Sequence, residues 1–573
     1  MSFSANQKNL IDVLTGNFQY FIQKNQRKYV WDEREWQELF EDIFEIEQTD
    51  EYKHFVGSIV ISNEGVSSNK FNIIDGQQRL ITISILFCAI ANKFNSIGEN
   101  DKANSIYKNY ILGDEDGDKY CKISRENETF FYSNLCNFLI DGYKTDEDIE
   151  KEFSISFNNR DKYNKSLLNC FLFFSKKLNG KLKNESLKID YLSKLKKKLR
   201  ETELIEIRVS NDNDAYRIFE TLNARGVPLE QHELIKNYIF SYMRSKPKQD
   251  KAYSAWEKIL SNLTSDSKDS IKNFVRHYCI HCFEKSKGKN EFKIIRDFTK
   301  KDEVEKLLNS LSSCSNYYSF ILNPELLKNT KYYSLKSYIA LNFFKKMNIM
   351  QVRPFLLSLF EIYDLNKISL NEFSNILETM ETFYFLYVIV GKYTTNTIDS
   401  SITNLAFIMH KNSVFDREEF NKFLNKFFPN IELIENNFKK LGFSNHNKKY
   451  KNSSNRRVIE YIFIKIELSF SNQYELPLKI PSIEHILDDS AGTDDVAFVG
   501  NLLPLSTKLN KKCKGKTFTQ KLDIYKESRF NLTIKFVEDY KDVVDWDNNS
   551  INKRSLDLMQ SYFSDIWKSK LTF

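Results

Sequence analysis

Five residues near position 75 have side chains and a spacing that could bind a phosphate group. They lie in NIIDGQQRLITISILFCAIANKF, residues 72 to 94, where an apolar strand is predicted to lead into a long apolar helix. Amides at the start of a helix attract anions, and an Arg guanidinium group matches phosphate geometry. The Gln side chains could donate to phosphate or position water, and the Asp could hold a metal ion or a ribose hydroxyl. The candidate residues of this nucleotide site are Asp75, Gly76, Gln77, Gln78 and Arg79.

A structural role is the alternative for this cluster, with Asp75 capping the helix and pairing with Arg79. Two further clusters that contain Arg favour the functional interpretation. One lies in FIQKNQRKYVWDEREW and the other in FETLNARGVPLEQHELIKN, and both are predicted at the ends of secondary-structure elements. Three such clusters are hard to explain by core packing alone. The predicted nucleotide site therefore also includes Gln26, Arg27, Asn223 and Arg225.

The common phosphate-binding loops are absent from the sequence. CKGKT, near residue 515, has Asn510 where the pattern G-x-x-x-x-G-K-[ST] requires Gly, and no G-x-G-x-x-G follows a predicted strand. A nucleotide site must therefore be built differently, as it could be around Asp75. An aromatic slot at Tyr20, Tyr29 and Trp31 is a conceivable sensor, but packing in the core is the favoured interpretation of all three.

A second group of residues, in IEHILDDS and GNLLPLSTKLN, could hydrolyse a phosphodiester bond. His485 could act as the general base that activates water, while Glu484 holds a divalent ion. Asn510 supplies a neutral oxygen ligand suited to Mg²⁺ or Mn²⁺. The alternative is one buried His and a solvated lysine loop. A patch of lysines that could contact DNA phosphates follows or flanks Asn510: Lys508, Lys511, Lys512, Lys514 and Lys516.

The sequence HYCIHCF comes closest to a metal-ligand cluster by spacing, with His277, Cys279, His281 and Cys282. Zinc sites usually need a second pair of ligands at a suitable distance, and none occurs nearby in the sequence. The favoured interpretation is therefore a plain helix, and a zinc site is the alternative.

The elements that position these residues are predicted to be mostly helical, because the 573 residues include only 16 Gly and 8 Pro. Residues 1–240 alternate strand-like runs with helices, which predicts an α/β domain with a helical insertion at about 95–200. Nearly continuous helical periodicity predicts a helical middle domain over 241–450. The basic stretch NHNKKYKNSSNRR, suited to a linker or a DNA-facing loop, introduces a C-terminal domain over 451–573. The predicted class is α+β, predominantly helical.

The charge and the cysteines of the sequence indicate which partners and which cellular location to expect. Lys and Arg (84) exceed Asp and Glu (77), which permits nucleic acid as a partner without showing it. The basic run KLKKKLR has Leu at helical spacing, which predicts the solvated face of an amphipathic helix rather than a DNA contact. Eight scattered Cys, an N-terminus without signal-peptide features and the lack of a long apolar run predict a cytoplasmic protein that does not span a membrane.

Three segments, FIQKNQRKYVW, HFVGSIVI with IIDGQQRLIT, and RIFETLNARGVPLEQHELIKN, together resemble a known domain. It is the N-terminal ParB/sulfiredoxin-like domain of GmrSD-type, modification-dependent (type IV) restriction endonucleases, which nucleases such as SspE and BrxU share. The resemblance covers about residues 10–95 and 200–240. It implies that the DGQQR residues, Asp75 to Arg79, bind and hydrolyse a nucleoside triphosphate (NTP). Gln23 stands where relatives usually have Pro.

The C-terminal motifs resemble the HNH-type (ββα-metal) nuclease domain that closes the same enzymes. The resemblance implies His485 as the general base and Asn501 as the residue that positions the catalytic loop. It implies Glu484 and Asn510 as the metal ligands. Relatives commonly have Pro where Asp488 stands.

The resulting prediction is a cytoplasmic, NTP-dependent DNA endonuclease or nickase that senses modified DNA in anti-phage defence. Its expected partners are double-stranded DNA, modified or of phage origin, an NTP such as GTP or UTP, and Mg²⁺ or Mn²⁺; it could form homo-oligomers. The main rival is a nucleotide-dependent DNA-binding switch protein with a degenerate nuclease domain, which Asp488 would allow. A plain NTPase is the third hypothesis.

Overall fold

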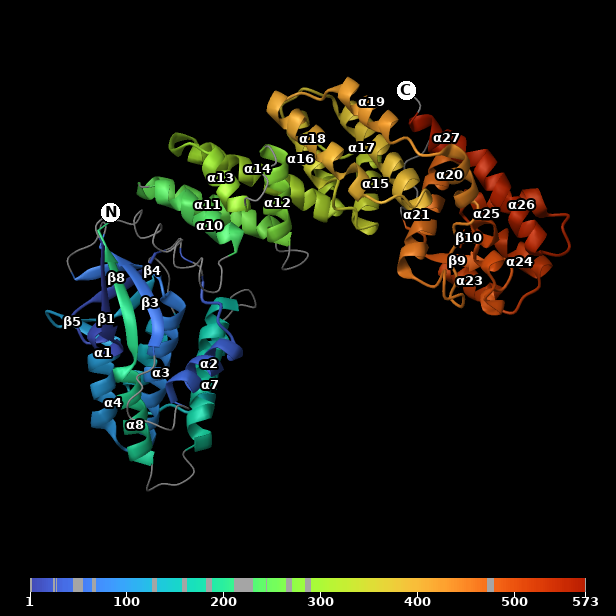
Figure 1. The fold of residues 1–573 in the computed structure, drawn as a ribbon. Helices are drawn as coiled ribbons and strands as arrows, with labels where there is room; N and C mark the ends of the chain where they lie inside the picture. The colour runs from blue at the N-terminus through green and yellow to red at the C-terminus, as the bar shows by residue number, and fades with distance from the viewer. Residues whose placement is uncertain are drawn as a thin grey trace. The chain divides into compact units, whose positions relative to one another are not determined.

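The computed structural model describes two compact units, residues 1–254 and 255–573 (Figure 1). Its elements make a predominantly helical α+β protein, which confirms the predicted fold class. The described residues are 3–23, 26, 28–44, 55–63, 69–125, 131–156, 162–181, 188–210, 230–243, 245–263, 270–283, 290–470 and 479–571.

A six-stranded mixed sheet, in the order β1-β8-β3-β4-β2-β7, forms the centre of the N-terminal unit. β2 runs parallel to β4 and to β7, so the C-terminal ends of these three strands meet at one edge of the sheet. β3 pairs antiparallel with β4 and parallel with β8, which pairs antiparallel with β1. The strands of this sheet are β1 (Phe3–Asn9), β2 (Gln19–Ile22), β3 (Phe55–Ser62), β4 (Lys70–Asp75), β7 (Ile123–Arg125) and β8 (Glu203–Val209).

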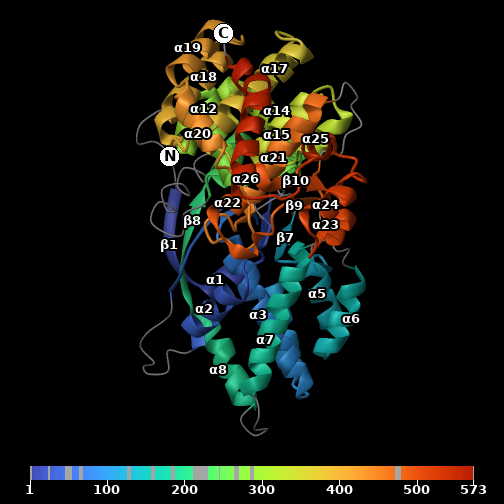
Figure 2. The same cartoon turned by 90° about the vertical axis from the view of Figure 1, so that its right-hand side faces the viewer.

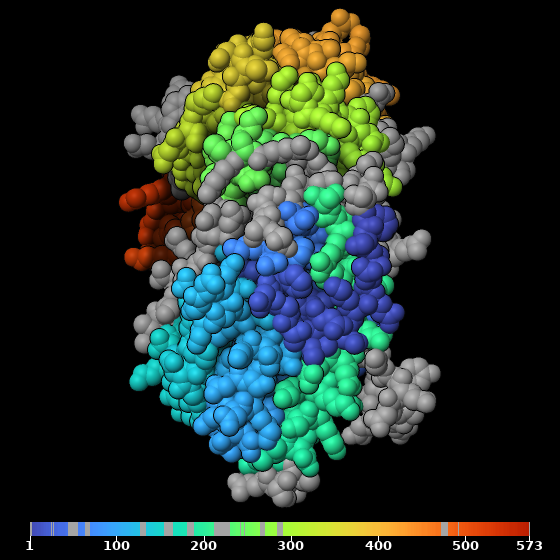
Figure 3. Space-filling view, turned by 90° about the vertical axis from the view of Figure 1, so that its left-hand side faces the viewer, coloured from blue at the N-terminus to red at the C-terminus, as the bar shows by residue number. Residues whose placement is uncertain are grey.

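The helix α3 (Gln77–Ser96) is the centre of the hydrophobic core in this unit. It is buried along nearly its whole length, as expected for a helix that is apolar on all sides. It packs against α4, α5, α7 and α8, and Figure 2 labels the last three of these helices. α1 contacts α8, and Figure 3 shows the dark-blue N-terminal residues beside green residues from the region near residue 200. The other helices here are α1 (Leu10–Leu14), α2 (Glu33–Phe44), α4 (Asn100–Ile106), η1 (Tyr107–Ile111), α5 (Phe131–Ile140), α6 (Asp146–Ser156), α7 (Lys162–Lys181), α8 (Lys188–Glu201), α10 (Gln231–Tyr242) and α11 (Lys246–Leu263), which runs into the second unit.

The region predicted as a helical insertion, residues 95–200, also contains strands. β7 joins the main sheet, and β5 (Leu112–Glu115) pairs with β6 (Asp118–Cys121) in a separate hairpin. The basic run KLKKKLR lies in α8, whose buried residues are Leu192, Leu195 and Leu199. The amphipathic helix predicted there is confirmed.

Within its described residues, the second unit is helical except for one short hairpin, β9 (Ser482–His485) and β10 (Leu502–Leu505). The domain boundary predicted near residue 450 lies inside this compact unit and stays a prediction. Before the hairpin lie α12 (Ser270–Cys282), α13 (Glu291–Phe298), η3 (Lys301–Glu303), α14 (Val304–Leu322), η4 (Pro324–Asn329), α15 (Leu335–Lys346), α16 (Arg353–Asp364), α17 (Leu370–Tyr384), η5 (Phe385–Val390), α18 (Asn396–Asn412), α19 (Arg417–Lys426), α20 (Ile431–Phe438) and α21 (Ser453–Phe470).

The two strands of the hairpin are joined through η6 (Asp489–Ala491), α22 (Asp494–Ala497) and η7 (Val499–Asn501). A separate hydrophobic cluster packs the hairpin against the helices that follow it. These are α23 (Thr507–Cys513), α24 (Phe518–Tyr525), α25 (Asn531–Tyr540), α26 (Asn548–Leu558), η8 (Met559–Phe563), α27 (Ser564–Ile566) and η9 (Lys568–Lys570).

No helix within the described ranges has the length and the apolar composition needed to cross a membrane. All eight Cys are free thiols. The cytoplasmic location stays a prediction.

Candidate functional site

The DGQQR residues lie where β4 ends and α3 begins, at the edge of the sheet shared by the C-terminal ends of β2, β4 and β7. Gly76 is the N-cap residue and has φ +89°, a conformation that favours glycine. A Cβ atom at this position would lie 2.7 Å from Ile59 Cγ2. Because the N-cap residue is a glycine, it offers no side chain to cap α3.

Gln78 holds the chain segment at residues 28–30 against the start of α3. Its Oε1 accepts a hydrogen bond from the Val30 amide at 2.8 Å, and its Nε2 donates to the Lys28 carbonyl oxygen at 3.1 Å. The side chain is buried, so both bonds form away from bulk water. Gln78 therefore positions the loop beside the site, and its amide is not free to contact a ligand.

Arg79 lies half-buried beside the same edge. Its Nη1 donates to the Ser58 carbonyl oxygen at 2.9 Å, and a Cβ at Gly57 would come within 3.2 Å of the guanidinium group. Burial lowers the pKa of Arg79, and the nearby Asp75 carboxylate opposes that shift. The geometry brings a cation, a carboxylate and the start of α3 together, as the sequence predicted.

The remaining predicted nucleotide-site residues differ in what the structure shows of them. Gln77 is buried at the start of α3, and Gln26 is also buried. The backbone carbonyl oxygen of Gln26 accepts a hydrogen bond from Arg125 Nη2 at 2.8 Å. Arg125 ends β7 at the same edge of the sheet and was not predicted from the sequence. Three predicted residues lie outside the described part of the chain: Arg27, Asn223 and Arg225.

The three aromatic residues considered as a sensor pack in the core or against it. Tyr20 and Tyr29 are buried, and Trp31 packs partly buried against the same core. The Tyr29 hydroxyl bonds to Thr82 Oγ1 at 2.6 Å and accepts a bond from Trp36 Nε1 at 2.7 Å. Core packing is confirmed for Tyr20 and Tyr29.

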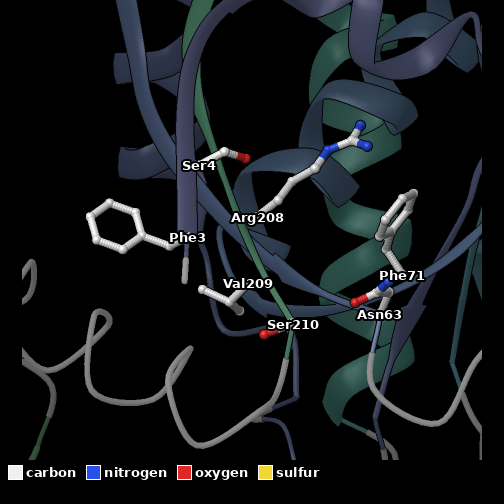
Figure 4. A pocket seen from close by; sticks show the side chains of 7 residues that line it. All are labelled: Phe3, Ser4, Asn63, Phe71, Arg208, Val209 and Ser210. Atoms are coloured by element: carbon white, nitrogen blue, oxygen red, sulfur yellow. The ribbon is translucent and has the colours of Figure 1, made fainter. Parts of the chain in front are cut away.

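A cavity of about 420 Å³ opens at the other end of the sheet, where β8 ends (Figure 4). The register places Val209 beside Ser62, whereas Asp75 pairs with Val60 toward the opposite edge. Arg208 in this cavity is held by Glu206 at 2.5 Å and stacks over Phe71. The cavity is thus separate from the DGQQR residues. Its lining is Phe3, Ser4, Asn63, Phe71, Arg208, Val209 and Ser210.

The second candidate site is built on two antiparallel strands followed by a helix, β9, β10 and α23 (Figure 1). His485 ends β9 and pairs in register with Leu502. Its Nε2 donates to the Phe443 carbonyl oxygen at 2.9 Å and lies 3.5 Å from Asp489 Oδ2. A neutral imidazole that donates through Nε2 has its lone pair on Nδ1. The geometry therefore leaves Nδ1 of His485 able to accept a proton.

Asp489 and the segment before α21 support His485, and the sequence analysis missed both. Asp489 Oδ2 accepts bonds from the Asn445 amide at 2.7 Å and from Ser444 Oγ at 3.1 Å, and Oδ1 lies 3.7 Å from Nε2 of the exposed His446. NHNKKYKNSSNRR, predicted as a linker or DNA-facing loop, thus begins by packing against the candidate site. The His485–Asp489 spacing of four residues was the available signal.

Glu484 lies on the opposite face of β9 from His485, as predicted for a regular strand. Its Oε1 accepts bonds from Lys521 Nζ at 2.8 Å and from the Tyr525 hydroxyl at 3.1 Å, and all three side chains are buried. Lys521 Nζ also donates to the carbonyl oxygens of His485 and Ile486, at 2.7 and 3.1 Å, which uses all three of its N–H groups. Burial, and then the Glu484 carboxylate, raise the pKa of Tyr525.

This arrangement does not fit the metal ligands predicted from the sequence. An ammonium group already neutralises the Glu484 carboxylate, so a divalent ion bound there would have to displace Lys521. Asn510, the other predicted ligand, donates from Nδ2 to the Ile483 carbonyl oxygen at 3.1 Å, and this bond does not use Oδ1, the atom that would bind a metal. No chemical step is therefore assigned to Mg²⁺ or Mn²⁺ at these two residues.

Asn501 fixes the loop between β9 and β10. Its Oδ1 accepts from the Leu487 amide at 2.8 Å and from Trp546 Nε1 at 3.2 Å, while its Nδ2 donates to the carbonyl oxygens of Leu487 and Val496. Gly500 precedes it because a Cβ there would lie 2.1 Å from the Ile551 carbonyl oxygen in α26. The side chain is fully buried, so Asn501 holds the loop and does not face solvent.

Asp488 keeps the backbone that a proline would require. Its φ is −55°, within the range that the proline ring imposes, and its carboxylate accepts a bond from the Ser490 amide at 2.8 Å. Hydrogen bonds from the Ser490 side chain and then from its amide lower the pKa of Asp488. The departure from Pro at this position therefore requires no change in the path of the chain.

The five predicted DNA-contacting lysines are all exposed, in α23 and just after it. Lys512 pairs with Glu527 at 2.7 Å, an exposed contact that a phosphate could replace at little cost. The patch Lys508, Lys511, Lys512, Lys514 and Lys516 thus presents positive charge to solvent beside the hairpin.

Comparisons with known proteins match both ends of the chain. Residues 9–240 match the family model described as GmrSD restriction endonuclease, N-terminal domain. Residues 434–561 match the model described as GmrSD restriction endonucleases, C-terminal domain. A search of curated proteins gave no match. The first match contains the DGQQR residues, and the second contains His485 and the segment that supports it.

Proposed function

Because the chain belongs to the GmrSD restriction endonuclease family, whose substrate is modified DNA, we propose that it hydrolyses the DNA backbone at His485 under the control of a nucleotide. The observation that carries the proposal is the position of His485. It is fixed through Nε2 by a backbone carbonyl, which leaves Nδ1 as the base, and it lies on a strand–strand–helix unit like that of HNH-type nucleases.

In the proposed reaction, Nδ1 of His485 removes a proton from water. The resulting hydroxide attacks phosphorus, the bond to the 3′ oxygen breaks, and solvent protonates the leaving oxygen. Asp489, beside Nε2, stabilises the imidazolium that forms. The lysine patch at residues 508–516 holds the DNA backbone. Asn501 keeps the loop in place and takes no part in proton transfer.

The nucleotide is proposed to bind at the DGQQR residues. Support comes from the edge of the sheet where Asp75, Arg79 and the start of α3 lie together. The Arg79 guanidinium would pair with phosphate oxygens, and the helix amides would add further donors. GTP and UTP are the first NTPs to test.

An experiment on the nucleotide site uses the full-length protein and two substitutions on one sheet. Arg79→Lys keeps the charge but loses the planar fork, so NTP hydrolysis should fall steeply. Arg208→Lys, at the other end of the sheet, is the matched control and should hydrolyse NTP at the normal rate. Equal activity of the two variants would contradict the proposed site.

The test of the whole function compares cleavage of three DNA substrates, with and without NTP. They are unmodified, glucosylated-hydroxymethylcytosine and phosphorothioate phage DNA. We expect cleavage of a modified substrate to exceed cleavage of unmodified DNA and to depend on NTP, as an anti-phage role requires. Equal cleavage of all three would contradict modification sensing.

The Lys521 contact favours a second candidate, a nucleotide-dependent DNA-binding switch protein with a degenerate nuclease domain. With Glu484 held by an ammonium group, the predicted metal ligands are not assembled. A plasmid nicking assay with Mg²⁺ or Mn²⁺ separates the two functions. DNA binding without nicking supports the switch, and nicking supports the nuclease.

A further inference from the structure

Three helices of the second unit bring a His/Cys cluster together that includes none of the residues of the two candidate sites. α12 contacts α16 and α18, which also contact each other (Figure 1). His281 and Cys282 end α12, and His410 lies near the end of α18. One potential ligand atom from each of the three side chains lies within 4.8 Å of the other two. HYCIHCF has no further ligand pair nearby in the sequence, but α18 brings His410 to it in the fold.

The hydrogen bonds of His281 direct a lone pair into this cluster. Ser358 Oγ donates its hydrogen to the Ala406 carbonyl oxygen at 2.7 Å, so it must accept the bond that joins it to His281 Nδ1 at 2.8 Å. Nδ1 therefore carries the proton, and Nε2 carries the lone pair. His281 is fully buried, and its Nε2 has no hydrogen-bond partner among the described residues. The nearest acidic atom, Glu361 Oε2, is 3.5 Å away and is itself an acceptor.

Glu361 orients the second imidazole in the same way. His410 Nδ1 lies 2.6 Å from Glu361 Oε2, which leaves Nε2 of His410 as the nitrogen with the lone pair. Histidines that bind metals usually donate their other N–H to a carboxylate or another fixed acceptor, because this sets the tautomer and the ring orientation. Ser358 and Glu361 supply that support to His281 and His410.

We propose that His281, Cys282 and His410 bind a divalent transition-metal ion of the zinc class. Two imidazoles and one thiolate are the ligand types that Zn²⁺ selects, whereas Mg²⁺ and Ca²⁺ prefer oxygen. A tetrahedral ion with Zn–N and Zn–S bonds of about 2.0–2.3 Å would draw the ligands closer together than 4.8 Å. The ion would join α12 to α18, which are far apart in the sequence, and water would fill the fourth position of a tetrahedral site.

Cobalt titration of the full-length protein tests this site directly. Co²⁺ bound to a thiolate gives a near-ultraviolet charge-transfer band, and we expect one equivalent to produce it in the metal-stripped protein. Cys282→Ser should lose the band, and Cys279→Ser, three residues earlier on the same helix, should retain it. The band also separates this site from the proposed nuclease site, whose named residues include no Cys.

The histidines are tested by affinity rather than by the band alone. Zn²⁺ competition against a coloured chelator should show no tight site in His410→Ala, and Glu361→Ala should weaken binding about 10- to 100-fold. Metal analysis of the protein as purified should give about one zinc per chain, because the donor set matches one tetrahedral ion. A wild-type protein that binds Zn²⁺ and Co²⁺ no better than Cys282→Ser would overturn the proposal. So would a charge-transfer band that persists in that variant.

Discussion

The DGQQR residues and the His485 hairpin are both polar motifs at the ends of strands, yet they use their side chains differently. In the first motif, both polar atoms of the Gln78 side chain are hydrogen-bonded to the backbone at residues 28–30. In the second motif, Nε2 of His485 donates to a backbone carbonyl oxygen, and Nδ1 carries the lone pair. A polar residue in a motif can therefore take part in a reaction only if one of its donor or acceptor atoms is not already hydrogen-bonded within the fold.

Replacing His485 should give the largest effect, because it removes the proposed general base. His485→Gln can still donate to the Phe443 carbonyl oxygen, so the fold and DNA binding should persist. Cleavage should fall about 10²- to 10⁴-fold, the usual contribution of a general base. Plasmid cleavage and DNA binding are measured on the same preparation. Normal cleavage by this variant would remove His485 from the mechanism.

Lys521 tests whether the neighbouring Glu484 serves the fold. Lys521→Met leaves a buried carboxylate without its cation and should lower the free energy of unfolding by about 3–5 kcal/mol. The double variant Glu484→Gln with Lys521→Met should recover part of that loss. Chemical denaturation of the full-length protein gives both values. The exposed pair Lys526–Asp523 is the control, and Lys526→Met should cost less than about 1 kcal/mol.

Gln78 tests the same idea at the N-terminal site. Gln78→Leu keeps the size of the side chain but leaves the Val30 amide and the Lys28 carbonyl without their partner. Loss of stability should be about 1–3 kcal/mol, the cost of unsatisfied buried polar groups. Gln7→Leu removes an exposed bond to Glu203 and should change thermal stability little. Equal effects of the two substitutions would show that the Gln78 contacts do not hold the loop.

The lysine patch should give the smallest effect per residue. Lys511→Ala and Lys514→Ala should each lower the slope of log affinity for DNA against log salt by about one, as expected when one phosphate contact is lost. Binding is titrated at several salt concentrations. Lys535→Ala, on α25, is the control. An unchanged slope in the patch variants would place the DNA elsewhere.

The sequence pattern predicted the helices and strands that have a strong apolar pattern. It missed the strands that form only because they pair with a neighbouring strand. The apolar strand β4 and the long helix α3 were predicted from their composition. FSANQKN has no such pattern, yet it forms β1 because β8 offers it a free edge. β7 was also missed, because it lies inside the predicted helical insertion and forms a strand by pairing with β2.

The candidate sites show the same limit. His485 and the DGQQR residues were found because their types and spacing lie close together in sequence. Lys521, Phe443 and His410 were not assigned their contacts, because each meets its partner only after distant helices pack. Spacing predicts which groups are available, whereas tertiary packing decides which atoms stay free.

Asn501 and Gly500 also set the order in which the hairpin can be completed during synthesis. Their partners on the C-terminal side are Trp546, Arg554 and Ser555, which hold the loop between β9 and β10 from outside. Because a chain leaves the ribosome from its N-terminus, His485 emerges well before these supports. These hydrogen bonds therefore hold the loop of the hairpin in place only after the region around residue 555 has been made.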